Sequence, residues 1–273
     1  MSTRASAIRN GDVVLACEGI ERSFGGLKAL KGVSFEIREG EIFGLVGPNG
    51  SGKTTMVNVI TGFYKPDAGS VHLFGRNITG MKPYRVAQQA LARTFQNLAL
   101  FRGMSVLDNI LLGRHVHMRP SAIASLFYWA MAAREETAHR RVVEEIIDFM
   151  QLQDIRDEPI ETVPPGLQKR VEFARALASE PRLLILDEPM AGMNQEEKEY
   201  IARFILDARD ERGVSILLIE HHMDVVTSLC ERALVLSYGE AIAQGPAREA
   251  ISSPAVVEAY LGHRAAQRLG AVA

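Results

Sequence analysis

A glycine-rich stretch of the chain has the residue types and the spacing that can bind phosphate groups. It reads Gly47-Pro48-Asn49-Gly50-Ser51-Gly52-Lys53-Thr54 and fits the pattern G-x-x-x-x-G-K-[ST] between an expected strand and an expected helix. Glycines let backbone N–H groups turn inward around phosphate oxygens, and the N-terminus of the helix adds a partial positive charge. The side chain of Lys53 can reach the β- and γ-phosphates, and the Thr54 hydroxyl can bind Mg²⁺. The stretch therefore predicts a site for the phosphates of a nucleotide.

Two adjacent carboxylates follow a run of aliphatic residues later in the chain, in the sequence LLILDEP. Asp187 falls at the end of the expected strand, where it can hold Mg²⁺ directly or through water. Glu188 is the candidate base that polarises an attacking water molecule. A buried strand often ends in a solvated acid, so the pair gains its meaning from the phosphate-binding stretch. Together the two motifs indicate hydrolysis of a bound phosphate compound.

Apolar residues recur with strand and helix spacing in alternation, which predicts an α/β fold with a mainly parallel sheet. The alternation is interrupted by a helical pattern from Val106 to Leu152, and we expect a helical lobe inserted at about residues 97–179. The expected strands are Val33–Ile37, Glu41–Val46, Ser70–Phe74, Leu183–Leu186, Val214–Ile219 and Ala233–Leu236. The expected helices are Lys53–Thr61, Glu196–Arg212, Met223–Cys230 and a short one near Pro254–Leu261.

The composition of the 273 residues is that of an ordinary soluble protein. Lys and Arg number 31 and Asp and Glu 33, so the net charge of −2 gives no electrostatic signature of nucleic-acid binding. The two cysteines, Cys17 and Cys230, have no metal-binding spacing and fit a reducing compartment. We expect no secretory signal in residues 1–12. The apolar stretch Ser121–Ala133 is too short to span a bilayer, and it fits either a buried helix or a docking surface.

The order of the motifs resembles the ATP-binding subunit of ABC transporters over essentially the whole chain. Gln96 in RTFQN matches the Q-loop of that family, and His221 in LLIEHHM matches its switch histidine. The segment PGLQKRVEFARAL occupies the place of its signature motif, and Phe24 in RSFGGLKAL stands where the family stacks an aromatic ring on adenine. The resemblance implies one P-loop NTPase domain over residues 1–273, with an N-terminal antiparallel β part, the inserted lobe and a short helical tail at 246–273.

The finer resemblance is to the group that imports branched-chain amino acids. AGMN at residues 191–194 is similar to the D-loop of that group. IEHHMDVV, AQGPAREAI and SPAVVEAYLG are similar to its C-terminal half, and GRHV fits its helical lobe. The implied activity is ATP hydrolysis coupled to solute uptake. An ATPase that drives lipid or glycolipid export is the alternative, followed by a soluble ABC ATPase that acts on nucleic acid or ribosomes.

The resemblance also assigns roles to individual residues. Gln96 would contact Mg²⁺ or the attacking water, Asp187 and Thr54 would hold Mg²⁺, Glu188 would be the catalytic carboxylate, and His221 would hydrogen-bond the γ-phosphate. Phe24 would stack on adenine, with a core position as its alternative, and His222 receives no role. The residues implied to wrap ATP are Gly47, Pro48, Asn49, Gly50, Ser51, Gly52, Lys53, Thr54 and Thr55.

The signature motif departs from the family pattern Leu-Ser-Gly-Gly-Gln. The chain has Val163-Pro164-Pro165-Gly166-Leu167 instead, so the serine that would reach the γ-phosphate held by a second subunit is lost. Gly166 remains, and its backbone N–H can still point at a phosphate together with the helix dipole. We expect this half of the site to be weakened but competent.

The implied partners follow from the same resemblance. They are transmembrane permease subunits, a second ATPase subunit (a different chain or a self copy) and, indirectly, a periplasmic or extracellular solute-binding protein, with no nucleic acid. The implied place is the cytoplasmic face of the cell membrane, where the chain would be peripheral.

Overall fold

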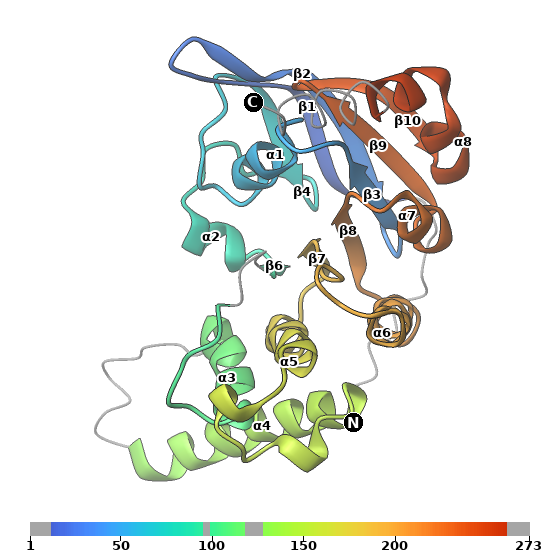
Figure 1. Cartoon of the computed structure of the whole chain (residues 1–273). Coiled ribbons are helices and arrows are strands. Elements are labelled where there is room, and N and C mark those ends of the chain that lie inside the picture. Colours follow the sequence, from blue (N-terminus) through green and yellow to red (C-terminus); the bar gives the residue numbers. More distant parts are fainter. Residues whose placement is uncertain (1–11, 95–98, 118–127, 261–273) are drawn as a thin grey trace.

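Two sheets form the frame of the protein, for which a computed structural model describes residues 12–94, 99–117 and 128–260 (Figure 1). A six-stranded sheet has the order β10-β9-β3-β8-β7-β6, parallel except for β10 at its edge. A four-stranded antiparallel sheet has the order β2-β1-β4-β5. The strands are β1 (Val13–Phe24), β2 (Leu27–Arg38), β3 (Ile42–Val46), β4 (Ala68–Leu73), β5 (Arg76–Asn77), β6 (Leu91–Arg93), β7 (Leu183–Asp187), β8 (Ser215–Glu220), β9 (Arg232–Ser237) and β10 (Glu240–Pro246). The mainly parallel sheet and the N-terminal antiparallel part are both confirmed.

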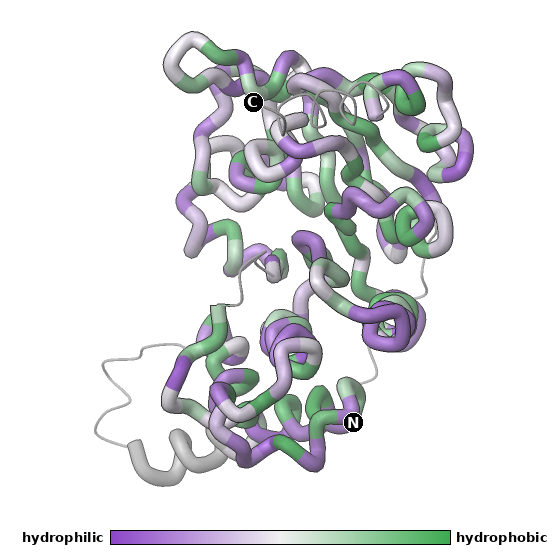
Figure 2. Tube along the Cα trace, viewed as in Figure 1, coloured by the Kyte–Doolittle hydropathy of each residue, from purple (hydrophilic) through white to green (hydrophobic). Residues whose placement is uncertain are grey.

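The central strands are buried on both faces and separate two hydrophobic clusters. Every residue of β3, β7 and β8 is buried, as expected for parallel strands covered on both sides. Alternate residues enter different clusters: Phe43 and Leu45 pack with α1 and the antiparallel sheet, whereas Ile42 and Val46 pack with the helices of the other side. In Figure 2, β8 and β9 are mainly hydrophobic, whereas the outer side of α6 is hydrophilic.

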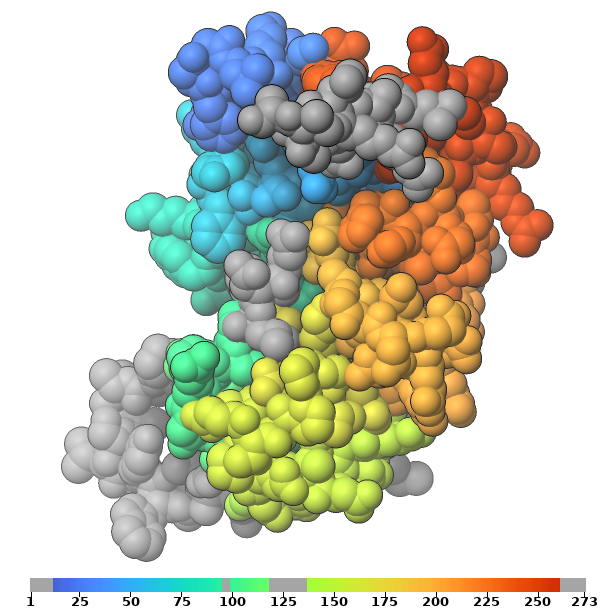
Figure 3. Space-filling view, in the orientation of Figure 1, coloured from blue at the N-terminus to red at the C-terminus, as the bar shows by residue number. Residues whose placement is uncertain are grey.

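Helices cover the sheet and build one end of the molecule. In Figure 3 the segment from α3 to α5 lies at one end and the antiparallel sheet at the other. α6 begins with a capping box between Asn194 and Glu197, which satisfies the first backbone N–H groups of the helix. The α-helices of the described residues are α1 (Lys53–Ile60), α2 (Pro83–Ala87), α3 (Val106–Leu111), α4 (Tyr128–Phe149), α5 (Pro165–Ala178), α6 (Gln195–Arg212), α7 (Met223–Leu229) and α8 (Ala247–Ser252). The same residues also form the 3₁₀ turns Leu112–His117, Gln153–Ile155 and Ile160–Thr162. Residues 254–260 are helical as well.

Several elements differ from those expected from the sequence. The expected strand Val33–Ile37 is the second half of the 12-residue β2, and β1, β6 and β10 were not expected. β6 has three residues, and in β10 the residues are exposed or half-buried, so neither leaves an apolar pattern. The helical pattern from Val106 to Leu152 is divided by the 3₁₀ turn Leu112–His117.

The described helices include none with both the length and the apolar character that crossing a membrane requires. Most of the stretch Ser121–Ala133 lies outside the described residues, as does the tail beyond residue 260.

Gly44 allows β3 to approach α7 closely. A Cβ at Gly44 would lie 2.8 Å from Cγ1 of Val226 and 3.2 Å from Sγ of Cys230. We predict that Gly44→Ala lowers the free energy of unfolding by about 1–3 kcal/mol through overpacking. Urea denaturation measures this change.

A double-mutant cycle with Val226→Ala tests the stated cause. Removing Cγ1 makes room for the new methyl group, so the double variant should lose about 1 kcal/mol less than the sum of the single losses. Simple additivity would contradict an overpacked contact between β3 and α7.

Candidate functional site

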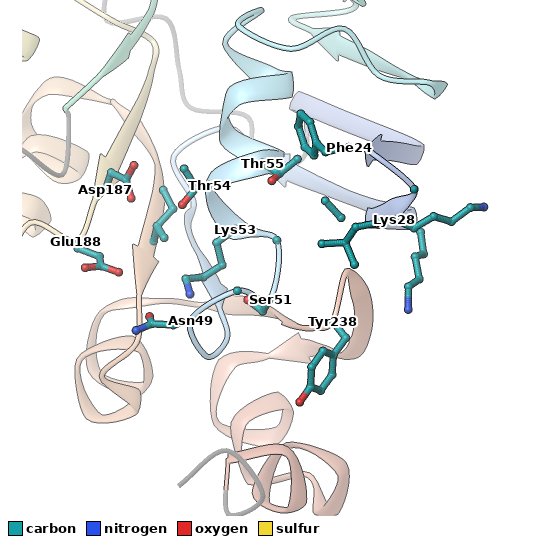
Figure 4. A pocket seen from close by; sticks show the side chains of 17 residues that line it. Phe24, Lys28, Asn49, Ser51, Lys53, Thr54, Thr55, Asp187, Glu188 and Tyr238 are labelled. Atoms are coloured by element: carbon teal, nitrogen blue, oxygen red, sulfur yellow. The ribbon is translucent and has the colours of Figure 1, made fainter. Parts of the chain in front are cut away.

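A cavity of about 940 Å³ lies where the loop after β3 meets the turn between β1 and β2 and the ends of β7, β8 and β9. Figure 4 shows Asp187 and Glu188 facing the Lys53 ammonium group, with Phe24 and Tyr238 farther away on the other side. The structure thus brings the two sequence motifs together. The lining residues are Phe24, Gly26, Leu27, Lys28, Ala29, Lys31, Asn49, Gly50, Ser51, Gly52, Lys53, Thr54, Thr55, Asp187, Glu188, Ile219 and Tyr238.

The loop from residue 47 to residue 52 is held tightly by its neighbours. Gly47 has a φ of 156°, and a Cβ there would collide with the carbonyl oxygen of Leu236. Gly52 has a φ of 109°, and a Cβ there would lie 2.8 Å from the carbonyl oxygen of Ala29. The amide of Gly239 donates a hydrogen bond of 2.9 Å to the Ser51 carbonyl. These two glycines are required by backbone conformation and by close approach.

Lys53 is the first residue of α1, and its side chain folds back along the loop. Its Nζ donates hydrogen bonds to the carbonyl oxygens of Gly47 at 2.6 Å and Pro48 at 3.1 Å, and the residue is only 6% exposed. Burial lowers the pKa of Lys53, and the carboxylates of Glu188, Asp187 and Glu220 oppose that effect. Thr54 is exposed to the cavity and Thr55 is half-buried.

Asp187 ends β7 and is paired with an arginine to which the sequence analysis gave no role. Its Oδ2 accepts a hydrogen bond of 2.8 Å from Nη2 of Arg93, at the end of β6. The backbone amide of Asp187 donates to Oγ1 of Thr94 at 3.3 Å. The described residues contain no cluster of three or more His, Cys, Asp or Glu that could hold a metal alone.

The oxygen donors beside Lys53 suit Mg²⁺ nevertheless. Thr54 contributes a hydroxyl and Asp187 a carboxylate, and both line the same cavity. Mg²⁺ prefers oxygen ligands and is usually held by one or two carboxylates together with the phosphates of a substrate. The residues present therefore fit this ion.

Glu188 and His221 lie on neighbouring loops and face each other. Nδ1 of His221 lies 3.6 Å from Oε1 of Glu188, and the backbone amide of Glu188 donates to the Ile219 carbonyl at 3.0 Å. Glu188 has a φ of 51°, a conformation that residues other than glycine rarely adopt. The ring of His222 lies 4.2 Å from that of His221. Because β7 and β8 are adjacent and parallel, the loops that follow them bring the Glu188 carboxylate and the His221 imidazole together.

Glu220, immediately before His221, is fully buried at the end of β8. Its Oε2 accepts a hydrogen bond of 3.3 Å from the His221 amide. Burial raises the pKa of Glu220, and the nearby imidazole of His221 opposes the rise. The buried Glu220 carboxylate thereby holds the backbone that leads into His221.

Phe24 is a surface residue at the rim of the cavity, so the core alternative is wrong. It is 38% exposed, and its ring meets that of Tyr64 edge-on at 5.1 Å. The guanidinium of Arg22 lies 4.8 Å above the Phe24 ring and is itself paired with Asp67 at 2.8 Å. These contacts fix the orientation of the ring.

Gly166 is not among the described residues that line the cavity. It lies in the first turn of α5, where a Cβ would collide with the Glu197 carboxylate. Nζ of Lys169 donates to the Ala191 carbonyl, which joins α5 to the segment before α6. Gln96 lies outside the described residues.

The sequence analysis gave no role to three residues near the site. Arg93, the first residue of the stretch RTFQN, holds Asp187, and Tyr238 lines the cavity from the turn after β9. Tyr260 packs on the hydrophobic cluster, with its hydroxyl close to the backbone of Gly47. Burial raises the pKa of Tyr260 to about 12, while the Gly47 backbone opposes the rise. Arg93 and Tyr260 lie in stretches that the family resemblance includes, RTFQN and SPAVVEAYLG, and those stretches were the available signal.

Known proteins share this architecture. A sequence profile described as ABC transporter matches residues 30–191. The branched-chain amino acid transport ATP-binding protein BraF of Pseudomonas aeruginosa is 35% identical, covering 91% of this chain and 98% of that protein. The probable LivG protein of Methanocaldococcus jannaschii is 36% identical, covering 91% and 97%. The crystal structure of an ABC transporter ATP-binding cassette in its ADP conformation aligns with a TM-score of 0.80 at 34% identity, covering 92% and 99%.

The profile covers more than half of the chain, and the relatives match it over nearly their whole length. Lys53, Asp187 and Glu188, which line the cavity, lie within the matched residues 30–191. The chain therefore belongs to the ABC transporter family, as one of its ATP-binding proteins.

Proposed function

We propose that this chain is the ATP-hydrolysing subunit of an importer for branched-chain amino acids or related small solutes. The observation that carries the proposal is the convergence of Lys53, Asp187 and Glu188 on one cavity with a glycine-rich loop, with His221 3.6 Å from Glu188. The substrate class is that of the branched-chain amino acid transport proteins BraF and LivG, which this chain matches over nearly their full length. The chain itself would touch ATP, not the transported solute.

ATP would bind with its phosphates in the loop after β3. Backbone N–H groups of the loop and the N-terminus of α1 would face the phosphate oxygens, as in other glycine-rich phosphate sites. Lys53 would exchange the carbonyls of Gly47 and Pro48 for the β- and γ-phosphates, because an anion is the stronger acceptor. Adenine would stack on Phe24, whose ring Arg22 and Tyr64 hold in place.

Mg²⁺ would be held by Thr54, Asp187 and, through the family resemblance, Gln96. When bound, it would supply charge neutralisation for the β- and γ-phosphates. The role of Asp187 requires its carboxylate to keep one orientation, which its ion pair with Arg93 favours.

Hydrolysis would require water to attack the γ-phosphorus while the bond to the ADP oxygen breaks and the water proton is removed. Glu188 would accept that proton, because its carboxylate is only 14% exposed and adjoins the cavity. His221, 3.6 Å from Glu188, would orient the water and bond the γ-phosphate. Transfer of the proton to Glu188 leaves ADP and phosphate as products.

A second ATPase subunit would complete the site. Gly166 and the N-terminus of α5 would contribute to the ATP held by that subunit, since they do not line the cavity of their own chain. ATP would then hold the two subunits together, and its hydrolysis would let them open and drive permease subunits at the cytoplasmic face of the membrane. We propose one domain over residues 1–273, a lobe at about 97–179 that transmits the motion, and a tail at 246–273.

Replacing the buried lysine tests the phosphate site. We predict that Lys53→Ala weakens ADP binding about tenfold to a hundredfold, because a hydrogen bond to a charged group is lost. Isothermal titration calorimetry on the full chain measures the affinity. Lys28→Ala is the matched control, since Lys28 lines the same cavity but is exposed and paired with Glu21 at 3.6 Å. Unchanged affinity in Lys53→Ala would remove the phosphate site from this loop.

Glu188→Gln separates hydrolysis from binding. The amide cannot accept the water proton, so we predict that ATP turnover falls about a hundredfold or more while ATP affinity is kept. Phosphate release is measured on the copurified transporter, and binding on the chain alone. Glu196→Gln removes an exposed carboxylate from the first turn of α6 and should leave turnover unchanged. Full turnover in Glu188→Gln would exclude Glu188 as the acceptor.

Uptake of labelled leucine, isoleucine and valine tests the transport assignment. Cells without this chain should lose ATP-dependent uptake, and the wild-type chain but not Glu188→Gln should restore it. Copurification with permease subunits should accompany uptake. Normal amino-acid uptake without the chain, together with defective lipid export, would contradict the importer assignment.

A further inference from the structure

Arg93 bridges two elements that carry the expected ligands of Mg²⁺. Its Nη2 donates to Oδ2 of Asp187 at 2.8 Å, and its Nη1 donates to Oδ1 of Asn58 at 2.8 Å. The side chains of Arg93 and Asp187 are only 10% and 6% exposed. The bridge is therefore largely shielded from solvent at its Asp187 arm and half-buried at its Asn58 arm, and both bonds have ordinary hydrogen-bond lengths.

The two acceptors belong to different parts of the site. Asn58 lies in α1 one helical turn after Thr54, so both side chains project from the same side of that helix. Asp187 ends β7, the strand that pairs with β6 in parallel. The guanidinium group thus connects the helix that bears the hydroxyl donor to the strand that bears the carboxylate donor.

The planar fork of arginine explains why this residue type suits the position. Separate nitrogens at fixed spacing can hold two acceptors at once, whereas a lysine ammonium group acts as a point charge on a flexible stem. Removing one partner of a buried ion pair leaves the other charge uncompensated. Oδ2 of Asp187 is engaged by Arg93, which leaves Oδ1 for a metal ion.

We propose that Arg93 is a positioning residue for the Mg²⁺ site. It fixes the orientation of the Asp187 carboxylate and the spacing between α1 and β7, so that Thr54 and Asp187 meet the same ion. The inference rests on the proposed function, since it takes nucleotide and Mg²⁺ as the occupants of the cavity. Partners that orient metal ligands typically change metal affinity by about tenfold to a hundredfold when they are mutated.

The affinity of the full chain for ADP, measured by calorimetry with and without Mg²⁺, tests this role. The wild-type chain should bind ADP more tightly with Mg²⁺. Arg93→Lys should lose about tenfold of that gain, and Asn58→Ala a smaller part, while ADP binding without Mg²⁺ stays unchanged. Asn58→Ala keeps the ion pair, so it tests the bridge even if Arg93→Lys unfolds. Arg182→Lys is the control, because Arg182 is an exposed arginine just before β7 that pairs with Glu39.

Four results would overturn the inference, and the fourth would refute the proposed metal site as well. Wild-type Mg²⁺ dependence in both Arg93→Lys and Asn58→Ala would show that the bridge does not position the site. Equal losses with and without Mg²⁺ would show a structural role only. An effect of Arg93→Met without one of Arg93→Lys would show that charge alone matters. A wild-type chain that binds ADP without any gain from Mg²⁺ would instead refute the proposed metal site, and the inference with it.

Discussion

Lys53 holds an ammonium group in a nearly closed space, between two backbone carbonyls and near three carboxylates. Burying a charge is costly unless it is paired and hydrogen-bonded, and here the loop itself supplies the acceptors. The three carboxylates come from Asp187, Glu188 and Glu220, on two strand ends. The strand ends that carry these carboxylates therefore help to offset the cost of burying the positive charge. A bound phosphate would take over the role of the loop carbonyls, so binding and loop geometry are linked.

The parallel sheet explains how those strand ends meet. β7 pairs with β8, and β8 with β3, so the residues that follow each strand emerge at the same edge. The strands are buried on both faces, which leaves their ends as the places where polar groups reach a cavity. Gly44 brings α7 close to β3, and the loop after β3 is then confined by Leu236 and Ala29. The packing of the core therefore helps to hold the loop after β3 in place.

The sequence predicted the groups that lie within short motifs and missed those that distant segments contribute. Lys53 and the Asp187–Glu188 pair were predictable, because each motif fixes both the residue types and the neighbouring strand. Arg93 was not, because it lies in a three-residue strand whose pairing with β7 leaves no periodic pattern. Tyr260 and Tyr238 were not, because their place depends on how the end of the chain folds back. Phe24 was predicted as a ring near adenine, and its exposure now excludes a core position.

The signature turn shows that one glycine can satisfy two demands. Pro164 offers no side-chain cap to α5. The Glu197 carboxylate, from the first turn of α6, lies next to the first turn of α5. Negative charge is favourable there, because the N-terminus of a helix carries partial positive charge. A Cβ at Gly166 would collide with the Glu197 carboxylate unless that side chain moved, so the first turn of α5 and Glu197 are closely packed. In the proposed pair of subunits, the Gly166 amide would face a phosphate held by the second subunit. The Glu197 carboxylate and that phosphate would then compete for the positive N-terminus of α5. The Glu197 carboxylate is held by the Asn194 backbone amide in the capping box of α6, which limits how far it can move away.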